Sequence, residues 1–294
     1  MLFGVPTTNY VRFQLVVWFF HINPIAGENK KKGRSDMMRS VEEIIGYELN
    51  ATDGEFGKCK DLLFDDRWWT IRHMVASTGP WLIGRLVLVS PLMIQQPDWE
   101  SRNIYLNVSR ETIENCPSPM EDETVSQEHE NKMALYYGYP NYWADEGIWG
   151  PVPNPAVAEL METEKESEDE KENPDQNHLR SFNEVKGYKI EAQDGTCGSV
   201  HDFILDDDTW ALRHVIVDTG NLVNPGKKII LPLDCVNRVS WSDRTLGVTL
   251  EKKDIHDGPE FRPDIPVNVE LEERLYDFYG RPYRRDVRRT EPAN

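Results

Sequence analysis

Short apolar runs broken by turns fill the chain from residue 46 to about 120 and recur from residue 187 to about 260. Residues 46–66 have the pattern of a strand, an Asp-Gly turn and a second strand, and Gly57 is placed for a bulge just after the turn. Another strand is expected over 70–77, and a near-continuous apolar run follows over 86–94. About five or six short strands within roughly 75 residues are typical of a small antiparallel barrel.

The second region repeats the first almost position by position. Gly46 matches Gly187, and later Tyr137 matches Tyr279 after the spacing has grown by one residue. The matched signature also includes Asp53 with Asp194, Gly54 with Gly195, Gly57 with Gly198, Trp69 with Trp210, and His73 with His214. Chance does not hold register over about 95 residues, so we predict a duplicated domain in which each copy has its own core.

Composition divides the chain into five parts. Between Glu159 and Asp175 there are nine acidic residues and two Lys, with almost nothing apolar, which is typical of a flexible linker. The expected parts are an N-terminal extension (1–37), a first barrel with an aromatic tail (38–143), a Pro-rich and acidic disordered linker (144–180), a second barrel with an aromatic tail (181–283) and a basic tail (284–294).

Charge and cysteine content narrow the function. The net charge of −18 argues against duplex DNA and anionic membranes as partners of the whole chain. The four cysteines, Cys59, Cys116, Cys197 and Cys235, form no CxxC pair and occupy non-equivalent places in the two copies. Reduced thiols in a cytoplasmic protein are therefore predicted, with no disulfide framework, metal site or cofactor.

The N-terminal region contains an apolar stretch over residues 11–22. It includes Arg12, is shorter than the ~20 residues that span a bilayer, and is followed by no clear small-residue cleavage site. We expect residues 1–36 to be an upstream extension produced by a misplaced start codon. The alternative is a membrane-associated or targeting segment, and only in that case do we expect contact with a membrane.

No catalytic or metal site stands out. His73 and His214 lie mid-strand among apolar neighbours and are interpreted as residues of the barrel wall. The acidic runs 65–66 and 206–208 lack the ligand spacing of a calcium loop and are interpreted as turns. No nucleophile elbow, phosphate-binding loop or HExxH helix is present, so we expect no enzymatic activity.

Aromatic and apolar side chains in loops are the candidate binding residues. Trp69 and Trp210 are equivalent and are expected in the cores, whereas Trp68 should point the opposite way from Trp69. The remaining candidates, Trp81, Leu82 and Leu222, lie in the variable hairpin loops. Exposed apolar side chains at a loop tip anchor partners; the alternative for Trp81 is that it folds back over its own barrel.

The aromatic tails and the basic end allow two interpretations each. The segments 131–143 and 273–282 are expected to cap their own barrels, with docking against the other copy as the alternative. The five Arg of residues 280–290 could touch nucleic acid, but a short basic tail in an acidic chain is expected to pair with the acidic linker or stay solvated.

The two copies resemble PRC-barrel domains. The shared features are an opening Gly-Tyr, Asp-Gly-x-x-Gly, an acidic hairpin before Trp and Arg, a Thr-Gly, and Leu-Pro-Leu in the second copy. That family includes the cytoplasmic domain of the photosynthetic reaction-centre H subunit and the C-terminal domain of a bacterial ribosome-maturation factor. The first copy has Ser77 where the second has Asp218, so contacts through this loop are expected to differ between copies.

The resemblance covers about two-thirds of the chain and implies an all-β protein with two tandem small antiparallel barrels joined by a flexible acidic linker. It implies binding and scaffolding, so we expect a non-enzymatic adaptor with protein partners, whose two copies give avidity. A role in RNA metabolism or ribosome assembly is the first alternative. A membrane-associated protein like the reaction-centre H subunit is the second.

Overall fold

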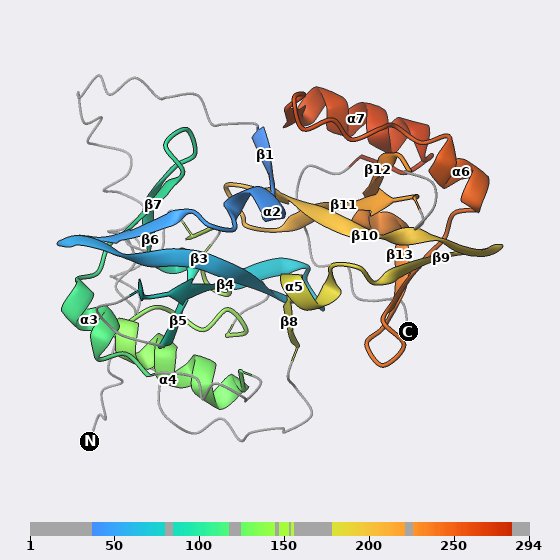
Figure 1. The fold of residues 1–294 in the computed structure, drawn as a ribbon. Helices are drawn as coiled ribbons and strands as arrows, with labels where there is room; N and C mark the ends of the chain where they lie inside the picture. Colours follow the sequence, from blue (N-terminus) through green and yellow to red (C-terminus); the bar gives the residue numbers. More distant parts are fainter. Residues whose placement is uncertain are drawn as a thin grey trace, which may run out of the picture. The chain divides into compact units, whose positions relative to one another are not determined.

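The computed structural model describes residues 37–79, 85–117, 125–144, 147–152, 154–155, 178–220 and 226–283. Both repeats lie in one compact unit. The described residues form mostly strands with a few short helices (Figure 1). The protein is therefore largely β, as the hydrophobic pattern indicates.

Each repeat forms one mixed sheet. In the first sheet the order is β5-β4-β3-β2-β7-β6, and in the second it is β12-β11-β10-β9-β14-β13. The strands of the first are β2 (Glu48–Ala51), β3 (Gly54–Asp65), β4 (Thr70–Ser77), β5 (Leu86–Val89), β6 (Ile94–Asp98) and β7 (Asn103–Leu106). Those of the second are β9 (Lys189–Ala192), β10 (Gly195–Asp206), β11 (Leu212–Asp218), β12 (Lys228–Pro232), β13 (Val236–Ser240) and β14 (Thr245–Val248).

The repeat in the sequence is thus a repeat in topology. One pair of neighbours along each of these orders is parallel, β2 with β7 and β9 with β14, and the other neighbours are antiparallel. A parallel pair needs a long connection, and here β3 to β6 and β10 to β13 provide it. Most buried apolar side chains come from these strands, so each sheet supports its own part of the core.

The expectation of closed antiparallel barrels is not met by the pairing of the described strands. The end strands of each sheet do not pair with one another. In the second repeat the outer edge of β12 is covered instead by residues 259–261: Ile230 N donates to Pro259 O (3.1 Å) and Phe261 N to Lys228 O (2.7 Å). A covered edge has its backbone groups satisfied without closure of the sheet.

Short helices flank the sheets. They are α2 (Val41–Ile44), α3 (Arg110–Glu114), α4 (Gln127–Tyr137), α5 (Phe182–Val185), α6 (Lys252–His256) and α7 (Val269–Phe278), with single 3-10 turns η2 (Pro91–Met93) and η4 (Leu233–Cys235). The Ser126 side chain caps the first turn of α4, and Gly138 ends that helix with φ 76°. Asn268 caps α7 in the same way.

The two repeats exchange strands at their N-terminal ends. β1 (Met37–Ser40), which precedes the first sheet, pairs with β10 of the second sheet and with β15 (Val267–Asn268). β8 (Leu179–Ser181), which precedes the second sheet, pairs with β3 of the first. Figure 1 shows β8 leading into α5 beside the first sheet. The repeats are therefore joined by backbone hydrogen bonds as well as by the chain between them.

The start of the segment expected to be a linker is folded. Trp149 is 1% exposed, and its Nε1 donates to Thr209 O of the second repeat at 2.7 Å. Ile148 O accepts a hydrogen bond from Arg72 in β4. Composition predicted a linker here because Pro and acidic residues dominate the segment, and a single buried aromatic residue does not change that average.

Candidate functional site

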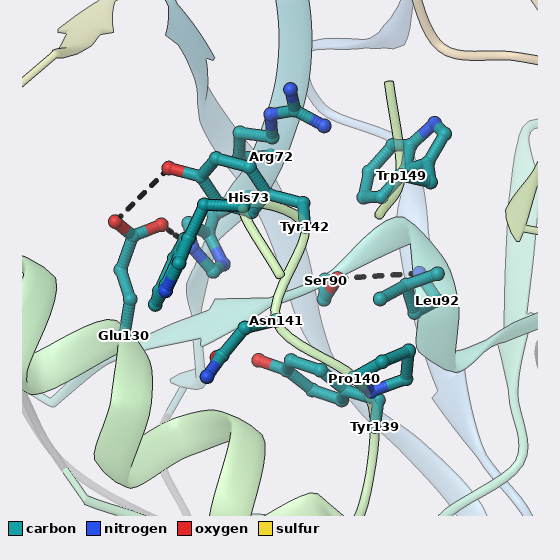
Figure 2. A pocket seen from close by; sticks show the side chains of 11 residues that line it. Arg72, His73, Ser90, Leu92, Glu130, Tyr139, Pro140, Asn141, Tyr142 and Trp149 are labelled. Atoms are coloured by element: carbon teal, nitrogen blue, oxygen red, sulfur yellow. Dashed lines mark hydrogen bonds and ion pairs between the residues drawn. The ribbon is translucent and has the colours of Figure 1, made fainter. Parts of the chain in front are cut away.

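Arg72 and His73 are neighbours in β4, yet both line the same small cavity beside α4 (Figure 2). In a regular strand adjacent side chains point to opposite faces. Leu63 pairs with His73 and Phe64 pairs with Ile71, so Arg72 is the extra residue of a β-bulge. The bulge turns the Arg72 side chain toward the side where His73 lies.

Glu130 of α4 is the acidic partner at this site. Its Oε1 lies 2.9 Å from His73 Nε2, and its Oε2 accepts a hydrogen bond from the Tyr142 hydroxyl at 3.2 Å. Figure 2 shows Glu130 reaching both groups from the helix. Burial and the nearby Glu130 carboxylate raise the pKa of Tyr142, so this phenol stays protonated and donates.

Arg72 is held mainly by aromatic rings. Its guanidinium carbon lies 3.9 Å from the centroid of Tyr142 and 4.9 Å from that of Trp149, within cation–π range. The Oδ2 atom of Asp65 lies 3.6 Å from Nη2 of Arg72. Burial lowers the pKa of Arg72. Nε and Nη2 of Arg72 have no hydrogen-bond partner among the residues that the structure describes.

The cavity between these groups has space for about one water molecule. Within the described ranges, no three His, Cys, Asp or Glu side chains are grouped to hold a metal ion, and the four cysteines are free and buried. A substrate-sized molecule does not fit this space. The arrangement fastens α4 and the following aromatic segment onto the first sheet.

The second repeat contains the matching cluster. Arg213 is again the bulged residue, between the pairs Ile204–His214 and Leu205–Leu212. Its Nε donates to Glu272 Oε1 at 3.0 Å, and His214 Nε2 lies 3.2 Å from the same oxygen. The Tyr283 hydroxyl donates to Glu272 Oε2 at 3.0 Å.

Here the arginine and the histidine share one carboxylate, whereas in the first repeat the arginine lies against rings. Burial works to raise the pKa of Glu272, but the His214 hydrogen bond and the Arg213 charge outweigh it and keep that pKa below its usual value. Burial lowers the pKa of His214, so its ring is neutral at pH 7.

The interpretation of His73 and His214 as wall residues among apolar neighbours missed both clusters. The partners lie 57 residues away for His73 and on α7 for His214, too distant for any local spacing. One signal was available, because Glu130 and Glu272 occupy equivalent positions ahead of the matched Tyr137 and Tyr279. The bulges had no comparable signal.

The aromatic segments after the sheets cap their own repeats, with one exception. Tyr279 OH donates to Ile230 O at 3.2 Å within the second repeat, and Tyr142 packs on Arg72 within the first. The exception is Trp149, which follows the first of these segments and reaches the second repeat.

Within the part of the chain that the structure describes, no helix has the length and apolarity to span a membrane. Residues 11–22 and 284–294 lie outside that part.

The candidate binding residues are only partly covered by the structure. Trp81, Leu82 and Leu222 lie outside the described residues. Trp68 is half-buried, and its backbone N–H donates to the Asp65 carboxylate (3.3 Å) in the turn before β4.

The signature turns hold backbone geometry that glycine permits. Asp53 and Gly54 join β2 to β3, and Asp194 and Gly195 join β9 to β10. A Cβ on Gly57 would meet Ser77 O at 2.2 Å, and one on Gly198, where φ is 109°, would meet Asp218 O at 2.3 Å. These glycines let neighbouring strands approach closely.

The acidic turns are held by their own backbone, as turn chemistry predicts. The Asp65 carboxylate accepts from Arg67 N at 2.8 Å, and Asp206 accepts from Asp208 N and Thr209 N, both at 2.9 Å. Each turn ends in a tryptophan with a left-handed backbone: φ is 50° at Trp69 and 58° at Trp210.

Two exposed aromatic rings occupy equivalent positions at the ends of α4 and α7, the helices that follow the two sheets. Tyr136 at the end of α4 is 40% exposed, and Phe278 at the end of α7 is 50% exposed. Each ring packs edge-on against the next, capping tyrosine with centroids 4.9 Å apart, Tyr136 on Tyr137 and Phe278 on Tyr279. The rings are thus held in place while remaining open to solvent.

Two equivalent aspartates mark the contact between the repeats. Asp202 of β10 accepts hydrogen bonds from the Ser40 hydroxyl, Glu42 N (3.0 Å) and Phe203 N (2.7 Å). Asp61 of β3 accepts in the same way from Ser181 and from Asn183 N. Burial raises the pKa of Asp202 to about 6, although these hydrogen bonds favour the ionised form.

Asp202→Asn is expected to change how stability depends on pH. The folded pKa of Asp202 lies above the ordinary 3.8, so between about pH 4 and pH 6 the folded state binds more protons than the unfolded state. The contribution of Asp202 to the free energy of unfolding therefore falls as pH rises through this window. Urea unfolding at pH 4.5 and pH 7.5 should show wild type losing stability relative to Asp202→Asn. If the free energies of unfolding of the two proteins differ by the same amount at both pH values, the prediction is wrong. Other groups, such as His214, titrate alike in both proteins and cancel in this comparison.

No model of a protein family matches this chain, and a search of the curated proteins found no match either. Function must therefore be argued from the arrangement of side chains. The charged clusters are closed and buried, whereas the aromatic rings of Tyr136 and Phe278 are accessible.

Proposed function

We propose that this chain is a non-enzymatic protein-interaction module of the PRC-barrel type, and that Tyr136 and Phe278 are its contact points for a partner protein. The repeated exposure of an aromatic ring at the same position of both repeats carries this proposal. An exposed ring held by a neighbour loses little conformational freedom on binding, which favours its use as an anchor.

The charges around these rings indicate the kind of partner. Asp277 is exposed on α7 next to Phe278, Arg274 is exposed one turn before it and pairs with Glu270, and the chain as a whole carries −18. A partner surface with an apolar centre and basic residues around it is complementary to this face. The same negative charge disfavours RNA, whose phosphates would be repelled.

Tyr136→Ala with Phe278→Ala is expected to abolish retention of the partner from an extract of the source cells. Loss of each anchor should cost about 2 kcal/mol, or roughly 30-fold in Kd, when binding is then measured with the purified partner. Binding should weaken as salt rises from 50 to 300 mM, because dissolved ions screen the attraction between exposed charges on the two proteins.

Ile265→Ala is the matched control, since Ile265 is 44% exposed but lies in the loop before β15. This variant should bind like wild type. Equal retention by wild type and the double variant, or retention of nucleic acid instead of protein, would overturn the proposal.

A further inference from the structure

The contact between the repeats is reciprocal. We call residues 37–45 and 178–186 the first and second arms; each consists of a short strand followed by one helical turn. The first arm lies on β10 of the second repeat, with Arg39 opposite Leu205. The second arm lies on β3 of the first repeat, with Arg180 opposite Phe64.

Side chains repeat this reciprocity. Arg39 Nε lies 3.4 Å from Asp207 Oδ2, and Arg180 Nε lies 3.1 Å from Asp66 Oδ2. These two ion pairs are equivalent, because Asp66 and Asp207 hold the same place in the two acidic turns. The two carboxylates are buried, with Asp207 6% and Asp66 9% exposed, and the two arginine side chains are partly exposed.

The repeats also meet around a local two-fold centre. Thr70 and Ala211 face each other in an antiparallel bridge. Ile71 N donates to Trp210 O at 2.8 Å, and Leu212 N donates to Trp69 O at 2.6 Å, one bond from each repeat. Next to this bridge the rings of Phe64 and Phe203 lie 5.9 Å apart.

The arm pairings, the arm ion pairs and the backbone hydrogen bonds at the central bridge each occur twice, so this surface fits one kind of partner, namely another repeat with the same arm and the same edge. The contacts do not depend on whether the two repeats belong to one chain. The sequence between them, residues 156–177, is acidic and has almost nothing to bury, so its composition does not oppose either arrangement.

We propose that two copies of this chain exchange repeats, with the first repeat of one copy closed on the second repeat of the other. Such a dimer contains the same arm contacts as the monomer, made twice. In dilute protein, closure within one chain is favoured, because the connecting residues 156–177 hold the second repeat near the first at an effective concentration in the mM range. Exchange is therefore expected where the local concentration of the chain is high.

Charge reversal tests this with full-length protein. The acid variant carries Arg39→Asp and Arg180→Asp, and the base variant carries Asp66→Arg and Asp207→Arg. Each variant has like charges at both arm contacts when closed on itself. An exchanged dimer of one acid and one base chain has opposite charges at all four contacts. The two are unfolded together at equal concentration, refolded, and weighed by native mass spectrometry.

The expected product is a mixed dimer, at least tenfold enriched over the dimer fraction of wild type refolded at the same concentration. A mixture that contains only monomers would overturn the proposal. A second readout does not depend on the charge reversals. Thr70→Cys with Ala211→Cys, which face each other, should form a disulfide within one chain in dilute protein and between two chains after refolding at high concentration. Only the intrachain disulfide at every concentration would also overturn it.

Discussion

Phe203→Ala is expected to lower the free energy of unfolding by about 3–5 kcal/mol. Phe203 is fully buried in β10, and its ring lies within 5.9 Å of the rings of Phe64 and Trp69 in the first repeat. Truncation removes packing on both sides of the contact and leaves a cavity that the sheets cannot close. Urea unfolding followed by fluorescence and circular dichroism measures the change.

The same variant should also separate the repeats. A protease site placed within residues 156–177 allows the chain to be cut after folding, and the halves of wild type should elute together in gel filtration because the arms still hold them. The halves of Phe203→Ala should elute apart. Leu106→Ala is the control, since Leu106 is buried in β7, which β2 separates from β3. It should lower stability by about 2–5 kcal/mol without separating the halves. Wild-type halves that elute apart would refute the claim that strand exchange holds the repeats.

Glu272→Ala is expected to cost about 3–5 kcal/mol, because it leaves the buried Arg213 charge without its carboxylate. His214 and Tyr283 lose a partner at the same time. The helix that carries Glu272 should then detach more readily from the second sheet, which hydrogen exchange of α7 would report. Glu273→Ala, an exposed neighbour on that helix, should change stability by less than about 0.5 kcal/mol.

The effect of Glu272→Ala should depend on pH with a definite sign. The folded pKa of Glu272 lies below its ordinary 4.5, so its contribution to stability is present above about pH 4.5 and is lost as pH falls through the folded pKa. The gap between wild type and Glu272→Ala should therefore be largest near neutral pH and shrink in acid. A cost no greater than that of Glu273→Ala would show that the cluster does not fasten the helix.

Local sequence features predicted much of each repeat. The Asp53-Gly54 and Asp194-Gly195 turns, the bulge near Gly57 and the Asx turn at Asp65 all lie where the residues indicate. These features depend on backbone conformations that few residue types adopt, so a short stretch of sequence is enough to find them.

The candidate site was harder to predict because it depends on two events that leave no local pattern. A bulge at Arg72 places neighbouring side chains on one side of the strand, against the period of two. Glu130 then arrives from a helix far along the chain. Only the duplication offered a clue, since equivalent acidic residues at Glu130 and Glu272 accompany equivalent histidines.

By itself the sequence determined that this protein is rich in β-structure, that its β-rich unit occurs twice, and where each unit turns, because alternation and turn chemistry act over a few residues. Tertiary structure alone decided that the sheets stay open, that the arms cross to the opposite repeat, and that His73 and His214 meet buried carboxylates. The Ser40–Asp202 contact joins residues 162 positions apart. Such contacts are selected by the burial and hydrogen bonding of the whole chain, and neither of their short sequences encodes the other.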